Sequence, residues 1–187
     1  MYLFHDLKLI YIIVPGTGSN SFHGSLKKKF NHWERVRVNG NHPAWDIDTN
    51  IRNAAHFTAR QAKLMIEPRT WAHYKKISFV RDPYDWVTSI YNKGGLLNSI
   101  GEDNTIPFHT FIKNLKITPY FWFTDNDGEV IVDKIYRTED LNTEIFEEFN
   151  CAQLYENKST GKKYPFSDDD KEIIQRKFKR EFIHYDR

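Results

Sequence analysis

The hydrophobic positions of the first 30 residues predict a buried strand, a loop and an amphipathic helix. Leu9–Val14 is an unbroken apolar run rich in β-branched residues, which is typical of a strand buried on both faces of a parallel sheet. Pro15 ends this run. Phe22, Leu26 and Phe30 then recur every four residues, which places one apolar stripe on a helix. The opening therefore predicts strand, loop and helix in that order.

A second strand and helix are predicted in the middle of the chain. Ile77–Val80 is another apolar run of the buried type, and it leads directly into Arg81. Asp82 is a favoured helix N-cap and Pro83 suits the first helical position. We therefore expect a helix from Pro83 through Tyr91, close to a pair of glycines that would end it.

The rest of the chain carries shorter patterns. Two apolar runs, Phe121–Thr124 and Val130–Ile135, flank a turn ending in Asp-Gly and predict a β-hairpin. Ser167–Ile183 predicts a helix with a serine cap, an acidic first turn and a basic C-terminal half. Weaker patterns predict a strand at Val36–Val38 and helices at Ala54–Ile66, Phe108–Leu115 and Thr143–Phe149. Alternating strands and helices predict an α/β fold: one domain, residues 1–187, with a mainly parallel central sheet flanked by helices.

Composition and charge narrow the class of protein. The 187 residues carry 27 basic and 25 acidic side chains, a balance that argues against general nucleic-acid binding. The single cysteine, Cys151, cannot form an internal disulfide, so a reducing, cytoplasmic setting and a microbial or viral source are expected. Asp6 and Lys8 interrupt the apolar Met1–Val14 stretch, which we interpret as a strand rather than a signal peptide, and no membrane span is expected. No acidic or histidine cluster has convincing metal-ligand spacing.

The loop after the first predicted strand has residue types suited to binding an anion. Glycine lets the backbone approach a ligand closely, and a helix N-terminus offers N–H groups and the positive end of the helix dipole. Its residues are Pro15, Gly16, Thr17, Gly18, Ser19, Asn20 and Ser21. An ordinary strand–helix turn is the structural alternative. The loop lacks the Gly-Lys-Ser/Thr ending of nucleoside-triphosphate loops, which disfavours a phosphoryl-transfer enzyme.

Arg81 and Ser89 form the second candidate element. Arg81 is expected at the carboxyl end of a strand, where ligands of open α/β sheets gather. Ser89 lies eight residues later, two turns into the predicted helix. A guanidinium fork and a hydroxyl suit a terminal phosphate. The alternative is that Arg81 pairs with a carboxylate for stability.

Together these elements resemble those of sulfotransferases that use 3′-phosphoadenosine 5′-phosphosulfate (PAPS), and most closely the carbohydrate sulfotransferases of the heparan 2-O type and their microbial relatives. The Phe79–Ser89 stretch is similar to the family's Phe-Val-Arg-Asp-Pro motif, and His56–Arg60 to its His-x-Thr-Ala-Arg segment. Asp127–Asp133 and Tyr136–Leu141 resemble later motifs. The likeness covers nearly the whole chain and implies a P-loop-like sulfotransferase fold.

The resemblance implies roles for individual residues. Pro15–Ser21 would hold the 5′-phosphosulfate, Arg81 and Ser89 the 3′-phosphate, and His56 would be the base that accepts the proton of an acceptor hydroxyl, with a carbohydrate as the expected acceptor. No metal is expected. The alternative is a non-catalytic protein that binds PAPS or its product adenosine 3′,5′-bisphosphate.

Two positions depart from the family pattern. Gly16 stands where the family usually has lysine, and Trp86 replaces its second arginine. The missing lysine would neutralise charge on the leaving phosphate oxygen. Candidate replacements by sequence are Lys27, Lys28, Lys29, Arg52 and Arg60.

Overall fold

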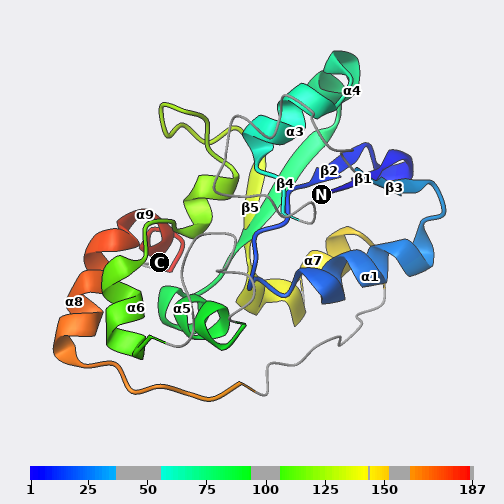
Figure 1. The fold of residues 1–187 in the computed structure, drawn as a ribbon. Coiled ribbons are helices and arrows are strands. Elements are labelled where there is room, and N and C mark those ends of the chain that lie inside the picture. The colour runs from blue at the N-terminus through cyan, green and yellow to red at the C-terminus, as the bar shows by residue number, and fades with distance from the viewer. Residues whose placement is uncertain (37–55, 94–105, 143, 152–160, 186–187) are drawn as a thin grey trace.

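The computed structural model describes residues 1–36, 56–93, 106–142, 144–151 and 161–185 (Figure 1). Within these residues a five-stranded sheet has the order β3-β1-β2-β4-β5. The strands are β1 (Tyr2–Phe4), β2 (Leu9–Tyr11), β3 (Trp33–Arg35), β4 (Lys75–Val80) and β5 (Lys134–Arg137). The helices include α1 (Ser19–Lys29), α3 (Ala59–Met65), α4 (Pro68–His73), α5 (Pro83–Asn92), α6 (Phe108–Asn114), α7 (Glu144–Glu148), α8 (Asp168–Lys177) and α9 (Lys179–Phe182). The α/β class predicted from the sequence is confirmed.

The sheet is mixed, so the expectation of a mainly parallel sheet is only partly met. β2, β4 and β5 run parallel, but β1 pairs antiparallel with both β2 and β3. The cause lies at the N-terminus, where the stretch predicted as one strand folds back on itself. A 3₁₀ turn at His5–Leu7 and a left-handed Lys8, with φ of 47°, reverse the chain between β1 and β2. The polar residues that interrupt the apolar run mark this reversal.

The alternating side chains of β2 and the residues after it enter two separate cores. Leu9, Tyr11 and Ile13 pack with Phe22 and other residues of α1 and α7. Ile10, Ile12 and Val14 pack on the opposite face with residues from α3, α5, α6 and α8. Figure 1 shows α1 and α7 on one side of the sheet and α5, α6 and α8 on the other. Burial on both faces explains why this segment is apolar at every position.

Several predicted elements have the expected bounds and caps. Asp82 Oδ1 accepts from the N–H groups of Tyr84 (3.0 Å) and Asp85 (3.1 Å), so α5 begins as predicted. Ser167 caps α8 and exchanges hydrogen bonds with Asp170 in a capping box. The predicted helix to Ile183 is interrupted at Phe178, which separates α8 from α9.

The predicted hairpin is the other local difference. A 3₁₀ turn (η3, Pro119–Trp122) occupies most of its first strand, and only an isolated bridge, Thr124 to Val130, joins the two arms. Gly128, with φ of 82°, forms the turn between them. Of the predicted Val36–Val38 strand only Val36 is described, just after β3; Ala54 and Ala55, the start of the predicted Ala54–Ile66 helix, also lie outside the described residues.

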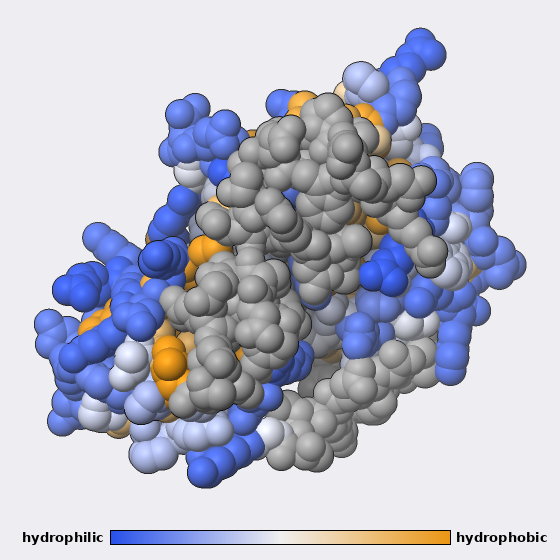
Figure 2. Space-filling model, viewed as in Figure 1, coloured by the Kyte–Doolittle hydropathy of each residue, from blue (hydrophilic) through white to orange (hydrophobic). Residues whose placement is uncertain are grey.

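The surface in view is mostly hydrophilic, and apolar residues appear on it in small separate patches (Figure 2). None of the described helices combines the length and the apolar character needed to cross a membrane.

Candidate functional site

The predicted loop and Arg81 lie at the same edge of the sheet. β2 and β4 are adjacent and parallel, so their carboxyl ends meet. β2 leads into α1 on one face of the sheet, whereas β4 leads into α5 on the other. Such a point, where chain connections leave toward opposite faces, opens the crevice in which open α/β sheets bind ligands. Pro15–Gly18 borders this crevice from one strand and Arg81 from the next.

The loop backbone alternates in handedness. Gly16 has φ of 80° and Gly18 has φ of 65°, while Thr17 between them keeps the ordinary negative φ. Alternation of this kind turns successive N–H groups toward one side and forms an anion-binding concavity. Gly18 is the N-cap residue of α1, so the concavity continues into the N-terminus of an eleven-residue helix.

Three side chains hold the loop through its carbonyl oxygens. Trp86 Nε1 donates to Pro15 O at 2.7 Å, and Arg81 Nη1 donates to Gly16 O at 3.2 Å. Thr138 Oγ1 lies 3.2 Å from Thr17 O and 2.9 Å from Val80 O, and so ties the loop to the end of β4. In a trans peptide the N–H points opposite to the C=O. The N–H groups of Gly16 and Thr17 are therefore directed away from Trp86 and Arg81.

The side chains of the loop differ in what they can offer. Thr17 is fully buried and its hydroxyl donates to Val14 O at 2.8 Å, so it maintains the turn rather than facing a ligand as the sequence suggested. Ser19 and Ser21 are partly exposed and Asn20 is exposed on the first turn of α1. The polar groups left to meet an anion are therefore the backbone N–H groups and the side chains of these three residues.

Arg81 and Ser89 differ in accessibility. The Arg81 side chain is 22% exposed, with Nη2 lying 3.6 Å from Asp85 Oδ2. That long contact and the bond to Gly16 O leave guanidinium donors for a phosphate. The pairing alternative raised by the sequence is thus present but weak. Ser89 is 3% exposed on α5, one turn beyond Asp85 on the same side of the helix.

Gly16 cannot carry the lysine that the family pattern places there. A Cβ at this position would lie 3.1 Å from Ile90 Cδ1 and 3.3 Å from Cδ1 and Nε1 of Trp86, and the φ of 80° disfavours any L side chain. The two departures from the family pattern are therefore one feature, because Trp86 fills the space beside Gly16 and also bonds the loop.

His56 lies beside the same loop. Its Nδ1 is 3.3 Å from Ile13 O, and since a carbonyl only accepts, Nδ1 carries the proton and Nε2 is the basic nitrogen. Burial lowers the pKa of His56 to about 4, and the charges of Lys93 and Arg35 act in the same direction, against the Ile13 bond. The imidazole is thus neutral from about pH 5 upward.

Lys93 is the basic residue that sequence reasoning missed. It ends α5, and loss of hydration followed by the charge of Arg81 lowers its pKa, although its side chain is exposed. Its spacing of four residues from Ser89 was a signal in the sequence, because residues i and i+4 share a helix face.

The cations chosen from sequence are placed elsewhere, apart from Lys28, which is exposed on α1, and Arg52, which lies outside the described residues. Lys27 lies over the rings of Tyr2 and Trp33, Lys29 bonds Asn150 O, and Arg60 bonds Asn126.

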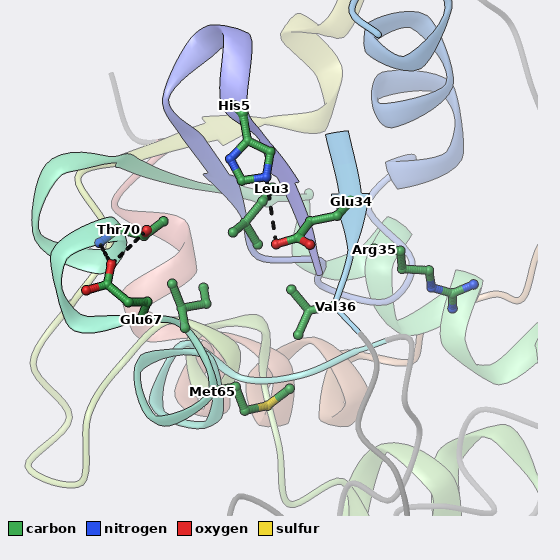
Figure 3. A pocket seen from close by; sticks show the side chains of 9 residues that line it. Leu3, His5, Glu34, Arg35, Val36, Met65, Glu67 and Thr70 are labelled. Atoms are coloured by element: carbon green, nitrogen blue, oxygen red, sulfur yellow. Dashed lines mark hydrogen bonds and ion pairs between the residues drawn. The ribbon is translucent and has the colours of Figure 1, made fainter. Parts of the chain in front are cut away.

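A separate pocket of about 400 Å³ lies between the N-terminal hairpin, β3 and helices α3 and α4 (Figure 3). Its rim includes Glu34, which is 3.8 Å from His5 Nε2, and Glu67, which caps α4 through Thr70. None of the predicted site residues lines it. Within the described parts of the chain, no three His, Cys, Asp or Glu side chains gather as metal ligands.

The comparisons with known proteins found no match, whether to a protein-family model, to a curated protein or to a solved structure. The functional argument therefore depends on the geometry of the site and on the motifs of the sequence.

Proposed function

We propose that this chain is a PAPS-dependent sulfotransferase of P-loop-like fold that transfers the sulfuryl group to a hydroxyl, with a carbohydrate as the expected acceptor. The observation that carries the proposal is the meeting of the two motifs across the β2–β4 crevice, where Arg81 Nη1 donates to Gly16 O at 3.2 Å. These segments are 65 residues apart in sequence, and each was assigned to one phosphate of the same ligand.

The residues present fit such a nucleotide. The Gly16–Gly18 backbone and the α1 N-terminus suit the 5′ side, and the remaining donors of Arg81 suit a 3′-phosphate in bidentate geometry. When bound, PAPS supplies an activated sulfuryl group, whose sulfur bonds to the acceptor oxygen as its bond to the phosphate oxygen breaks and that oxygen keeps the electron pair.

The chain's own groups would orient the reactants and move one proton. His56 Nε2 accepts the proton of the acceptor hydroxyl, while its Nδ1–H stays on Ile13 O and fixes the ring. A base with a pKa near 4 is weak, so its contribution depends on orientation more than on proton affinity. The loop N–H groups stabilise the negative charge that remains on the nucleotide.

A second candidate function is binding of PAPS or adenosine 3′,5′-bisphosphate without transfer. The observation that favours it is the filling of the space at Gly16 by Trp86 and Ile90, which leaves no place for the family's lysine. Substituting lysine at Gly16 is therefore a poor test of this alternative, because the loop would have to move to admit it.

The transfer reaction separates the two functions and tests His56. Wild-type protein incubated with ³⁵S-labelled PAPS and a panel of glycans should label an acceptor. His56→Gln should lower the transfer rate by about 10²-fold, within the usual range for a general base, and leave bisphosphate affinity within about twofold of wild type. Because the pKa of His56 is lowered to about 4, the wild-type rate should stay flat from pH 8 to about 5.5 and fall toward pH 4 as the imidazole gains a proton.

His73 provides the matched control. It is exposed on α4, where Nδ1 bonds Arg69 O, so His73→Gln should transfer at the wild-type rate. Equal rates for His56→Gln and wild type would exclude His56 as the base. Nucleotide binding with no labelled acceptor on any glycan would favour the binding function.

A further inference from the structure

We propose that Lys93 supplies the cation that faces the phosphate held by the Pro15–Gly18 loop, in place of the lysine that Gly16 cannot carry. The inference rests on the proposed function and assigns a residue to its site. A residue that contacts the nucleotide is meant here, not one that acts through the fold alone.

The first argument is the geometry of α5 against the loop. Trp86 and Ile90 are the side chains that a Cβ at Gly16 would meet, so their side of the helix packs on the loop. Lys93 lies three residues beyond Ile90, and residues at this spacing are neighbours on a helix surface, one turn or about 5.4 Å along the axis. The Lys93 stem therefore leaves the helix one turn beyond the contact with Gly16.

The second argument is the charge around Lys93. The charge of Arg81 contributes to the lowered pKa of Lys93, and the charge of Lys93 contributes to the lowered pKa of His56. These mutual effects place the ammonium group within electrostatic range of the guanidinium that bonds Gly16 O and of the imidazole that bonds Ile13 O. Positive groups that raise one another's energy in this way are stabilised when an anion binds among them.

The third argument compares Lys93 with the other described cations considered for this role. Lys27, Lys29 and Arg60 contact rings or carbonyl groups on other parts of the surface, as described above. Lys93 keeps an exposed side chain on a flexible four-carbon stem, so its ammonium can reach a ligand.

Nucleotide binding by calorimetry tests the assignment without using transfer activity. Three ligands are titrated: adenosine 3′,5′-bisphosphate, adenosine 5′-monophosphate and adenosine 3′-monophosphate. Lys93→Met, which keeps the length and removes the charge, should weaken binding of the two ligands that carry a 5′-phosphate by about tenfold. Its affinity for adenosine 3′-monophosphate should match wild type within twofold, and Lys93→Arg should retain most of the 5′-phosphate affinity.

Lys28→Met is the matched control, since Lys28 is an exposed lysine on α1, and it should bind all three ligands as wild type does. If wild type binds and Lys93→Met binds every ligand equally well, or loses the 3′-monophosphate to the same degree, the assignment of Lys93 is wrong while the proposed function stands. If wild type binds none of the three, the proposed function itself fails. Thermal melting of each variant shows whether it is folded, and Lys93→Arg carries the test if Lys93→Met melts early.

Discussion

Trp86→Ala should lower the free energy of unfolding by about 3–5 kcal/mol, the largest stability effect expected for a single substitution in this chain. Trp86 is fully buried, its ring lies 5.7 Å from that of Phe178 and 6.5 Å from that of Trp122, and its Nε1 holds Pro15 O. Removing the indole opens a cavity between α5 and the loop and leaves Pro15 O without this donor. Urea unfolding followed by circular dichroism measures the loss.

Two further variants separate packing from the hydrogen bond. Trp86→Phe keeps an aromatic ring but loses the N–H, and should cost about 1–3 kcal/mol with a disproportionate loss of nucleotide affinity, because the loop is released. Trp33→Ala is the surface control, since Trp33 is 37% exposed, and should cost clearly less than Trp86→Ala. A loss below 1 kcal/mol for Trp86→Ala would contradict the packing described for the loop.

Arg81→Ala should weaken binding of adenosine 3′,5′-bisphosphate by about 100-fold. Arg81 is the guanidinium nearest the crevice that contacts the loop directly, through Gly16 O, and charge-assisted bonds to a phosphate contribute about 1.5–3 kcal/mol. The variant loses both the phosphate contact and one bond that positions the loop. Isothermal titration calorimetry of the folded variant measures the change in Kd.

The matched variants are Arg81→Lys and Arg69→Ala. Arg81→Lys keeps a charge but loses the planar fork, so its affinity should fall between wild type and Arg81→Ala. Arg69 is exposed on α4, which precedes the amino end of β4, so Arg69→Ala should bind like wild type. Undiminished affinity in Arg81→Ala would remove Arg81 from the site.

Local patterns predicted the elements that position the site. The continuous apolar run of Leu9–Val14 required burial on both faces, and it is buried on both faces. Asp82 and Pro83 marked the start of α5 because capping depends on neighbouring residues only. The reversal at Lys8 was missed because a left-handed turn of this kind has no strong signature in a residue other than glycine or asparagine.

The site was predictable as far as topology allowed. Two parallel strands bring their carboxyl ends together, so motifs that follow them were expected to meet. The inward hydroxyl of Thr17 and the contact of Trp86 with Gly16 depend on packing between segments about 70 residues apart, which no local pattern encodes. For the same reason, the sequence presented Gly16 and Trp86 as two departures although they act as one.

The most direct test of the central claim is a titration of the wild-type protein with adenosine 3′,5′-bisphosphate, with adenosine 5′-monophosphate as the comparison ligand. The site described here predicts one bisphosphate per chain and at least tenfold weaker binding of the monophosphate, because the monophosphate lacks the group that Arg81 is expected to hold. Absence of bisphosphate binding, or equal affinity for the two ligands, would contradict the assignment of Pro15–Ser21 and Arg81 as a PAPS site.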